Sequence, residues 1–190
     1  MRTAEINRAT KETDIKLKLG LDGGETSIGS GNGFFDHMLE LFAGHSGYGL
    51  QLECIGDIQV DFHHSCEDIG IALGRAFDEA LGDRAGINRY GWIILPMDEA
   101  LIMVSADISG RGMLCFDAEM PAARVGEFRY RAGERILDSL LSGSRSDFAY
   151  PGAGRGEYTS YHRGYIQGLR SRFRHGYCHR SRQSRENTFH

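Results

Sequence analysis

The sequence of 190 residues lacks the features of exported and membrane proteins. No run of 18 apolar residues occurs, which excludes a simple membrane-spanning helix. Met1 to Gly20 alternates charged and apolar residues, without the basic, apolar and small-residue order of a signal peptide. We therefore expect a soluble cytoplasmic protein with no membrane partner.

Cysteine is scarce and shows no pairing pattern. The four cysteines have no CxxC spacing, which argues against a disulfide framework and against a cysteine zinc site. We expect reduced thiols at Cys54, Cys66, Cys115 and Cys178.

Lysine is absent from residues 144–190, which hold nine arginines and three acidic residues and so carry a charge of +6. The whole chain carries -4, which leaves -10 for residues 1–143. A basic tail usually indicates nucleic acid or an acidic surface as its partner. This tail is also rich in Gly, Ser and Tyr and has no periodic apolar stripe, so we expect no nucleic-acid partner and no regular fold there.

Apolar periodicity in the rest of the chain predicts an α+β domain. A hydrophobic content of 41% with 25% charged residues is sufficient for one compact core. Alternation predicts strands over residues 14–19, 50–54, 58–62, 92–97, 101–108 and 113–116. Helical spacing predicts helices over 34–45 and from about His63 to Leu81. Helices should then cover one face of a mostly antiparallel sheet.

A group of histidines and acids follows the third predicted strand. If the helix begins near His63, that residue lies four positions before Glu67 and His64 lies three before it, so each imidazole can approach the carboxylate. Neutral imidazole with carboxylate suits Mn, Fe or Zn, and the different directions of adjacent histidines favour two separate metal centres. The alternative is a polar helix start capped by Asp61. The motif alone leaves both interpretations open.

Two further kinds of residue are compatible with a site. His37 lies inside an otherwise apolar helix, where a histidine is either a metal ligand or a hydrogen-bonded core residue. Arg89 and Arg111 occupy Gly-flanked turns, where a guanidinium can grip a phosphate bidentately or form a surface salt bridge.

Taken in order, these motifs resemble the imidazoleglycerol-phosphate dehydratase family over residues 2 to about 128. The segments that carry the resemblance are 8–13 (Arg-Ala-Thr-Lys-Glu-Thr), 33–39 (Gly-Phe-Phe-Asp-His-Met-Leu), 61–68 (Asp-Phe-His-His-Ser-Cys-Glu-Asp), 87–91 (Ile-Asn-Arg-Tyr-Gly), 96–101 (Pro-Met-Asp-Glu-Ala-Leu) and 109–111 (Ser-Gly-Arg). The resemblance implies two similar βα halves of the ribosomal protein S5 domain 2-like type, with the second half disrupted here. It also implies a 24-subunit assembly.

The resemblance further implies a manganese hydro-lyase of histidine biosynthesis that acts on a small phosphate substrate. Two Mn²⁺ ions per subunit, bound between subunits, would hold the imidazole ring of imidazole glycerol phosphate as an imidazolate while a proton and hydroxide leave. Carried over residue by residue, Glu12 would be the acid/base group, Arg89 and Arg111 would bind the phosphate, and the first-half metal ligands would be His37, His63, His64 and Glu67.

The last third departs from the family, whose second half carries a Thr-Leu-His-Ile-Arg strand and a second His-His-Ile-Ile-Glu helix. Residues 147–151 can be encoded as GAC TTT GCA TAT CCG, and reading one base later yields Thr-Leu-His-Ile. The same offset applied to residues 157–164 yields Asn-Thr-His-His-Ile-Ile-Glu. We therefore predict a dehydratase-like region over 1–143 and an out-of-frame basic tail over 144–190, with a shorter slip of the same kind over 129–137.

Two alternatives remain from the sequence. In one, the first half folds as a non-catalytic assembly or binding protein whose basic tail contacts nucleic acid. In the other, the chain is a different His/Glu metalloenzyme such as a hydrolase, although this leaves Arg89, Arg111 and residues 34–38 without a role.

Overall fold

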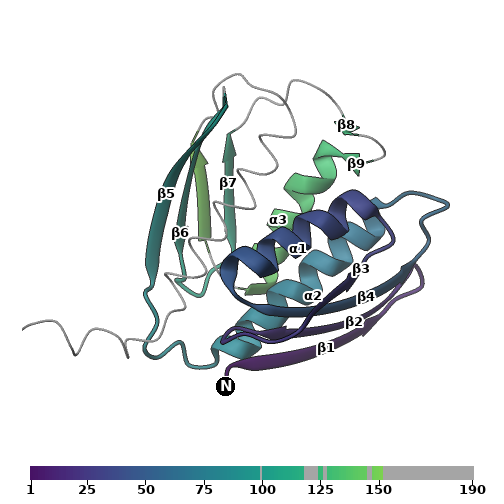
Figure 1. Ribbon diagram of the computed structural model, residues 1–190, viewed down its shortest axis with the longest axis horizontal. Coiled ribbons are helices and arrows are strands. Elements are labelled where there is room, and N and C mark those ends of the chain that lie inside the picture. The colour runs from purple at the N-terminus through teal and green to yellow at the C-terminus, as the bar shows by residue number, and fades with distance from the viewer. Residues whose placement is uncertain (99, 118–123, 126–127, 145–146, 152–190) are drawn as a thin grey trace, which may run out of the picture.

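The computed structural model describes residues 1–98, 100–117, 124–125, 128–144 and 147–151 (Figure 1). Its helices are α1 (Gly33–Ser46), α2 (His63–Leu81) and α3 (Tyr130–Ser144). Its strands are β1 (Thr3–Ala9), β2 (Thr13–Gly20), β3 (Thr26–Gly29), β4 (Gly49–Gly56), β5 (Tyr90–Met97), β6 (Ala100–Asp107), β7 (Met113–Asp117), β8 (Arg124–Val125), β9 (Phe128–Arg129) and β10 (Asp147–Pro151). No helix among these residues is long and apolar enough to cross a bilayer.

The two large sheets repeat one topology. The first has the order β1-β2-β4-β3 and the second the order β5-β6-β10-β7. In each sheet the first three neighbours pair antiparallel, whereas the last pair, β4 with β3 and β10 with β7, is parallel. In the first half α1 precedes β4 along the chain, and in the second half α3 precedes the equivalent strand β10. The expected α+β class and the two similar halves are therefore present.

The helices lie between the two sheets (Figure 1). In β2 the buried residues Ile15, Leu17 and Leu19 alternate with exposed Lys16 and Lys18, so one face of the first sheet is apolar and packs against the helices. On the helix side, α1 and α2 bury large apolar side chains. Phe77, which is fully buried, makes edge-to-face contacts with Phe42 and Tyr48.

The predicted strand over residues 58–62 is wrong. This segment is a turn, closed by a hydrogen bond from the Val60 N–H to the Asp57 carbonyl, and it leads directly into α2. The alternation of apolar residues in this segment does not mark a buried face, because Ile58 and Val60 are both exposed. The preceding strand β4 is already paired with β2 on one side and β3 on the other.

Regular structure also occurs where none was predicted, at β1, β3, α3 and β10. Strand β10 lies within the tail predicted to lack a regular fold, so that prediction is wrong for residues 147–151. The strand is inserted between β6 and β7, where backbone groups on both sides supply hydrogen-bond partners irrespective of side chain. Residues 152–190 of the tail lie outside the described residues.

Glycines allow the backbones of α2 and α3 to come into direct contact. A Cβ added at Gly74 of α2 would meet the carbonyl oxygen of Leu140 and lie 2.9 Å from the Cα of Gly143. A Cβ at Gly70, one turn earlier, would lie 2.9 Å from the carbonyl oxygen of Ile136. Helix α3 thus packs closely on α2, with Leu140 and Leu141 buried. The shorter slip over 129–137 stays a prediction.

A buried carboxylate joins α2 to the first hairpin. Asp68, whose side chain is 12% exposed, accepts hydrogen bonds from the Arg8 guanidinium at 2.6 and 3.1 Å. It also accepts from the hydroxyls of Thr13 and Thr10. Burial raises the pKa of Asp68, but the bonds from Thr13 and Arg8 outweigh burial and hold that pKa below its ordinary value.

We expect Gly74→Ala to destabilise the fold by about 1–3 kcal/mol, because the added methyl meets the α3 backbone, which cannot move as a side chain can. The matched control is Gly44→Ala on α1, where a Cβ meets nothing within 4 Å and helix propensity should add up to about 1 kcal/mol. Urea unfolding of both variants measures the difference. Equal effects of the two substitutions would contradict the close α2–α3 packing.

We expect Asp68→Asn to lower the free energy of unfolding at neutral pH by about 3 kcal/mol, because Arg8 loses its partly buried partner. The depressed carboxyl pKa stabilises the fold above the unfolded pKa of about 4, and this contribution is lost as pH falls through the folded pKa. The wild-type advantage over Asp68→Asn should therefore shrink below about pH 4. Denaturant titrations at several pH values check this, and a difference that does not depend on pH would count against it.

Candidate metal-binding site

His63 and His64 form the start of α2, as the sequence predicts. Their ring centroids lie 4.0 Å apart with the ring planes inclined at 49°. The Asp61 carboxylate accepts a hydrogen bond from the His63 backbone N–H at 3.2 Å, which satisfies one of the N–H groups that a helix start leaves unpaired. The N-cap position is occupied by Phe62, which has no side-chain cap bond, so Asp61 is not the cap that the alternative interpretation expected. Its bond to the His63 N–H still supports the helix start and is compatible with a site at the histidines.

A carboxylate lies against the Nδ1 atom of each histidine. His64 Nδ1 is hydrogen-bonded to the two Asp57 oxygens at 3.2 and 3.1 Å, and His63 Nδ1 lies 3.3 Å from an Asp61 oxygen. The two imidazole side chains are 37% and 36% exposed. A carboxylate on one ring nitrogen orients the imidazole and leaves the other nitrogen as a metal donor, the arrangement usual around metal-binding histidines.

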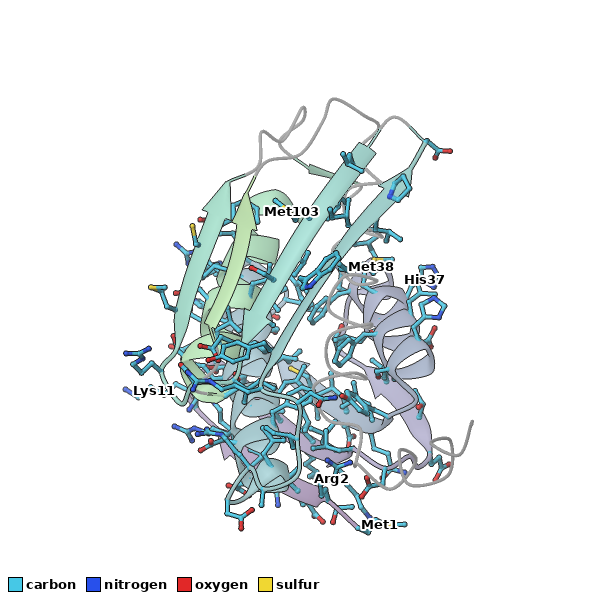
Figure 2. The ribbon with its side chains drawn as sticks, turned by 90° about the vertical axis from the view of Figure 1, so that its left-hand side faces the viewer. Met1, Arg2, Lys11, His37, Met38 and Met103 are labelled. Carbon is cyan, nitrogen blue, oxygen red and sulfur yellow. The ribbon has the colours of Figure 1, made fainter. Side chains whose placement is uncertain are left out.

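Glu67 and His37 lie on the exposed sides of their helices. Glu67 is near Arg135 of α3, with 3.8 Å between the charged atoms, and both side chains are about half exposed. His37 projects from α1 away from the rest of the chain (Figure 2). The starts of α1 and α2 are in contact through the edge-to-face pair of Phe35 and Phe62, whose centroids are 5.9 Å apart.

The four predicted ligands do not converge within one chain. Across the described part of the protein, no three His, Cys, Asp or Glu side chains gather closely enough to hold one ion. The structure therefore brings His63 and His64 together, while His37 and Glu67 are presented to the surface from neighbouring helix segments. Any complete ion site needs donors beyond these.

Glu12 lies in the exposed loop between β1 and β2. Its carbonyl oxygen accepts a hydrogen bond from the Asp57 backbone N–H at 3.0 Å, and its own N–H donates to the Thr10 hydroxyl at 3.2 Å. Because Asp57 is also bonded to His64, the loop that carries Glu12 is connected to the histidine pair. This connection was not predicted, since it depends on a tertiary contact between two turns.

Arg89 and Arg111 lie at one end of the second sheet. Arg89 directly precedes Tyr90, which pairs with Asp107 at the end of β6, and Arg111 follows in the turn to β7. The Arg89 guanidinium donates to both Asp107 oxygens, at 2.7 and 3.1 Å, and lies 4.9 Å from the Tyr90 ring centroid. The surface salt bridge considered for Arg89 is therefore present, and a phosphate would have to compete with Asp107.

The described cysteines take no part in this arrangement. Cys54, Cys66 and Cys115 are free thiols, as predicted, and Cys178 lies outside the described residues. Burial raises the pKa of both Cys54 and Cys66, so these two thiols stay protonated in the core.

Comparison with known proteins identifies one family. Residues 30–149 match the sequence model of imidazoleglycerol-phosphate dehydratase. The imidazoleglycerol-phosphate dehydratase of Pelobacter propionicus is 58% identical over 142 residues, 74% of this chain and 73% of that protein. The one of Caldicellulosiruptor saccharolyticus is 55% identical over 145 residues, 76% and 75% of the two chains.

A solved structure supports the same assignment. The crystal structure of imidazoleglycerol-phosphate dehydratase from Staphylococcus aureus superposes with a TM-score of 0.83 at 29% identity, covering 92% of this chain and 97% of that one. The sequence resemblance over the first two thirds and the repeated α+β topology thus agree. The chain belongs to the imidazoleglycerol-phosphate dehydratase family.

Proposed function

We propose that this protein is a hydro-lyase of histidine biosynthesis. Its reaction removes water from D-erythro-imidazole glycerol phosphate and produces imidazole acetol phosphate. The observation that carries this proposal is the 58% identity to a dehydratase over 142 residues, a stretch long enough to include both histidine motifs. The paired carboxylate–imidazole contacts at the start of α2 are compatible with the metal centre that this reaction needs, because a carboxylate commonly orients a metal-binding histidine.

The proposed donor groups are of the chemical types that manganese binds. We assign His37, His63, His64 and Glu67 as ligands from the first half, since three imidazoles and one carboxylate suit a borderline divalent ion. Because the four do not converge in one chain, further ligands would come from the second half or from another subunit. When bound, the two ions per subunit would supply a Lewis acid for the imidazole ring of the substrate.

The remaining side chains would bind substrate and move protons. Glu12 is exposed, and its backbone is hydrogen-bonded to Asp57, which in turn bonds to His64, so we assign its carboxylate as the acid/base group of this site. Arg89 and Arg111 would hold the phosphate. For Arg89 this means exchanging the Asp107 carboxylate for phosphate, which replaces one bidentate acceptor with another.

Self-association into the family's 24-subunit assembly is part of the proposal. The outer face of the second sheet presents large apolar side chains, with Trp92 74% and Ile94 51% exposed and Leu101 and Met113 nearby in the same sheet. The corresponding face of the first sheet carries Lys16, Lys18 and Glu53 instead. An exposed apolar face of this kind favours contact with another protein surface. We propose a cytoplasmic enzyme without nucleic-acid or membrane partners.

We propose that the chain as printed does not complete this site. In the first half, β4 leads into α2, which carries the histidine pair; the corresponding segment of the second half would follow β10. Beyond Pro151 the sequence holds only isolated histidines, at positions 162, 175, 179 and 190, and no His-His pair. The division into a dehydratase-like region over 1–143 and an aberrant tail over 144–190 rests on this difference and on the codon argument.

Purified as printed, the chain should not dehydrate imidazole glycerol phosphate with added Mn²⁺, whereas a version restored by the one-base shift should. Loss of one acid/base group costs ~10²- to 10⁴-fold in rate, and loss of several ligands removes the metal itself. Turnover, manganese content and sedimentation of both versions in one buffer test this. If the printed chain assembles, holds two metals per subunit and turns over like the restored one, the account of its tail fails.

A further inference from the structure

Asp57 joins the two parts of the candidate site. Its backbone N–H donates to the Glu12 carbonyl at 3.0 Å, and its carbonyl accepts from the Val60 N–H at 2.8 Å. Its carboxylate oxygens lie 3.1 and 3.2 Å from His64 Nδ1. One residue of the β4–α2 turn therefore fixes the Glu12 loop on one side and an imidazole on the other.

The hydrogen bond determines which nitrogen of His64 carries its proton. An ionised carboxylate can only accept, so a neutral His64 must hold its proton on Nδ1 and leave Nε2 unprotonated. The Asp57 side chain is 19% exposed, so water competes weakly for its oxygens, whereas the ring itself is 36% exposed. Without the carboxylate, either nitrogen of the imidazole could be protonated.

His63 lacks an equivalent link to the Glu12 loop. Its neighbour Asp61 lies 3.3 Å from Nδ1, but that carboxylate also accepts the His63 backbone N–H and so belongs to the helix start itself. Asp57, by contrast, reaches His64 across the turn from a backbone position that is tied to the first hairpin. The two histidines can therefore be tested separately.

We propose that Asp57 is a positioning residue that holds His64 with its Nε2 unprotonated, available to a divalent metal, and in a set orientation relative to Glu12. The metal-binding part rests on the proposed function, whereas the protonation of the ring does not. Asp57 itself touches neither metal nor substrate in this proposal.

The first experiment uses the metal-free printed chain labelled with ¹⁵N-histidine. A long-range ¹H–¹⁵N correlation spectrum near pH 8, above the ordinary titration range of histidine, distinguishes the two neutral ring forms. His64→Gln assigns the signal. We expect the Nδ1–H form for His64 in the wild type and a shift toward the Nε2–H form in Asp57→Ala, with His63 unchanged.

Asp22→Ala is the matched control. It also removes a hydrogen-bonded aspartate, the partner of Arg2, at the opposite end of β1 and β2 from the Glu12 loop. It should leave both histidine signals in place. Should Asp57→Ala fold poorly, Asp57→Asn replaces it. The amide NH₂ of asparagine can donate to Nδ1, so this variant no longer favours the Nδ1–H form of His64. An Nε2–H form in the wild type, or no change in either Asp57 variant, overturns the proposal.

The second experiment measures Mn²⁺ affinity in the chain with its tail restored. Loss of a carboxylate partner of a metal-binding histidine should weaken binding about 10- to 100-fold, while Asp22→Ala should leave it unchanged. If the restored wild type binds no manganese, the proposed function fails and the histidine spectra still decide the role of Asp57. If it binds and Asp57→Ala binds equally well, the positioning role fails.

Discussion

The candidate site depends on the buried contact between Asp68 and the first hairpin. Arg8, Thr10 and Thr13 donate to one carboxylate on α2, which holds the β1–β2 loop against the first two turns of that helix. Asp57 makes the second connection, from the same loop to His64 one helical turn before Asp68. Two carboxylates, Asp68 four residues after His64 and Asp57 seven residues before it, thus hold a histidine and the Glu12 loop together.

The repeated topology underlies the proposal that only half of the site is present. The same strand order and pairing sense recur in both sheets, and α3 precedes β10 as α1 precedes β4. Strand β10 forms although its residues differ from the family's strand, because strand pairing uses backbone groups. Metal binding has no such tolerance, since only particular side chains donate to an ion. An out-of-frame segment can therefore keep a strand of the fold while losing the ligands that the same segment would carry.

Sequence patterns predicted the elements whose apolar spacing matches their burial. In β2 and β4 alternation corresponds to one buried face, and α2 begins at His63 and ends at Leu81 as its spacing predicts. Alternation failed over 58–62, which forms the turn between β4 and α2. The contacts of Asp57 with His64 and of Arg89 with Asp107 could not be predicted, because they join residues seven and 18 positions apart whose approach depends on how the chain turns and packs. The roles of the site residues stay predictions.

The central claim, that a family dehydratase carries an out-of-frame last third, is tested most directly by the nucleotide sequence across the codons for residues 129–183. Translation one base later should yield Thr-Leu-His-Ile at the codons for 147–150 and His-His-Ile-Ile-Glu within those for 157–164, without stop codons between them. A nucleotide sequence whose shifted frame lacks these motifs, or is interrupted by stops, would contradict it.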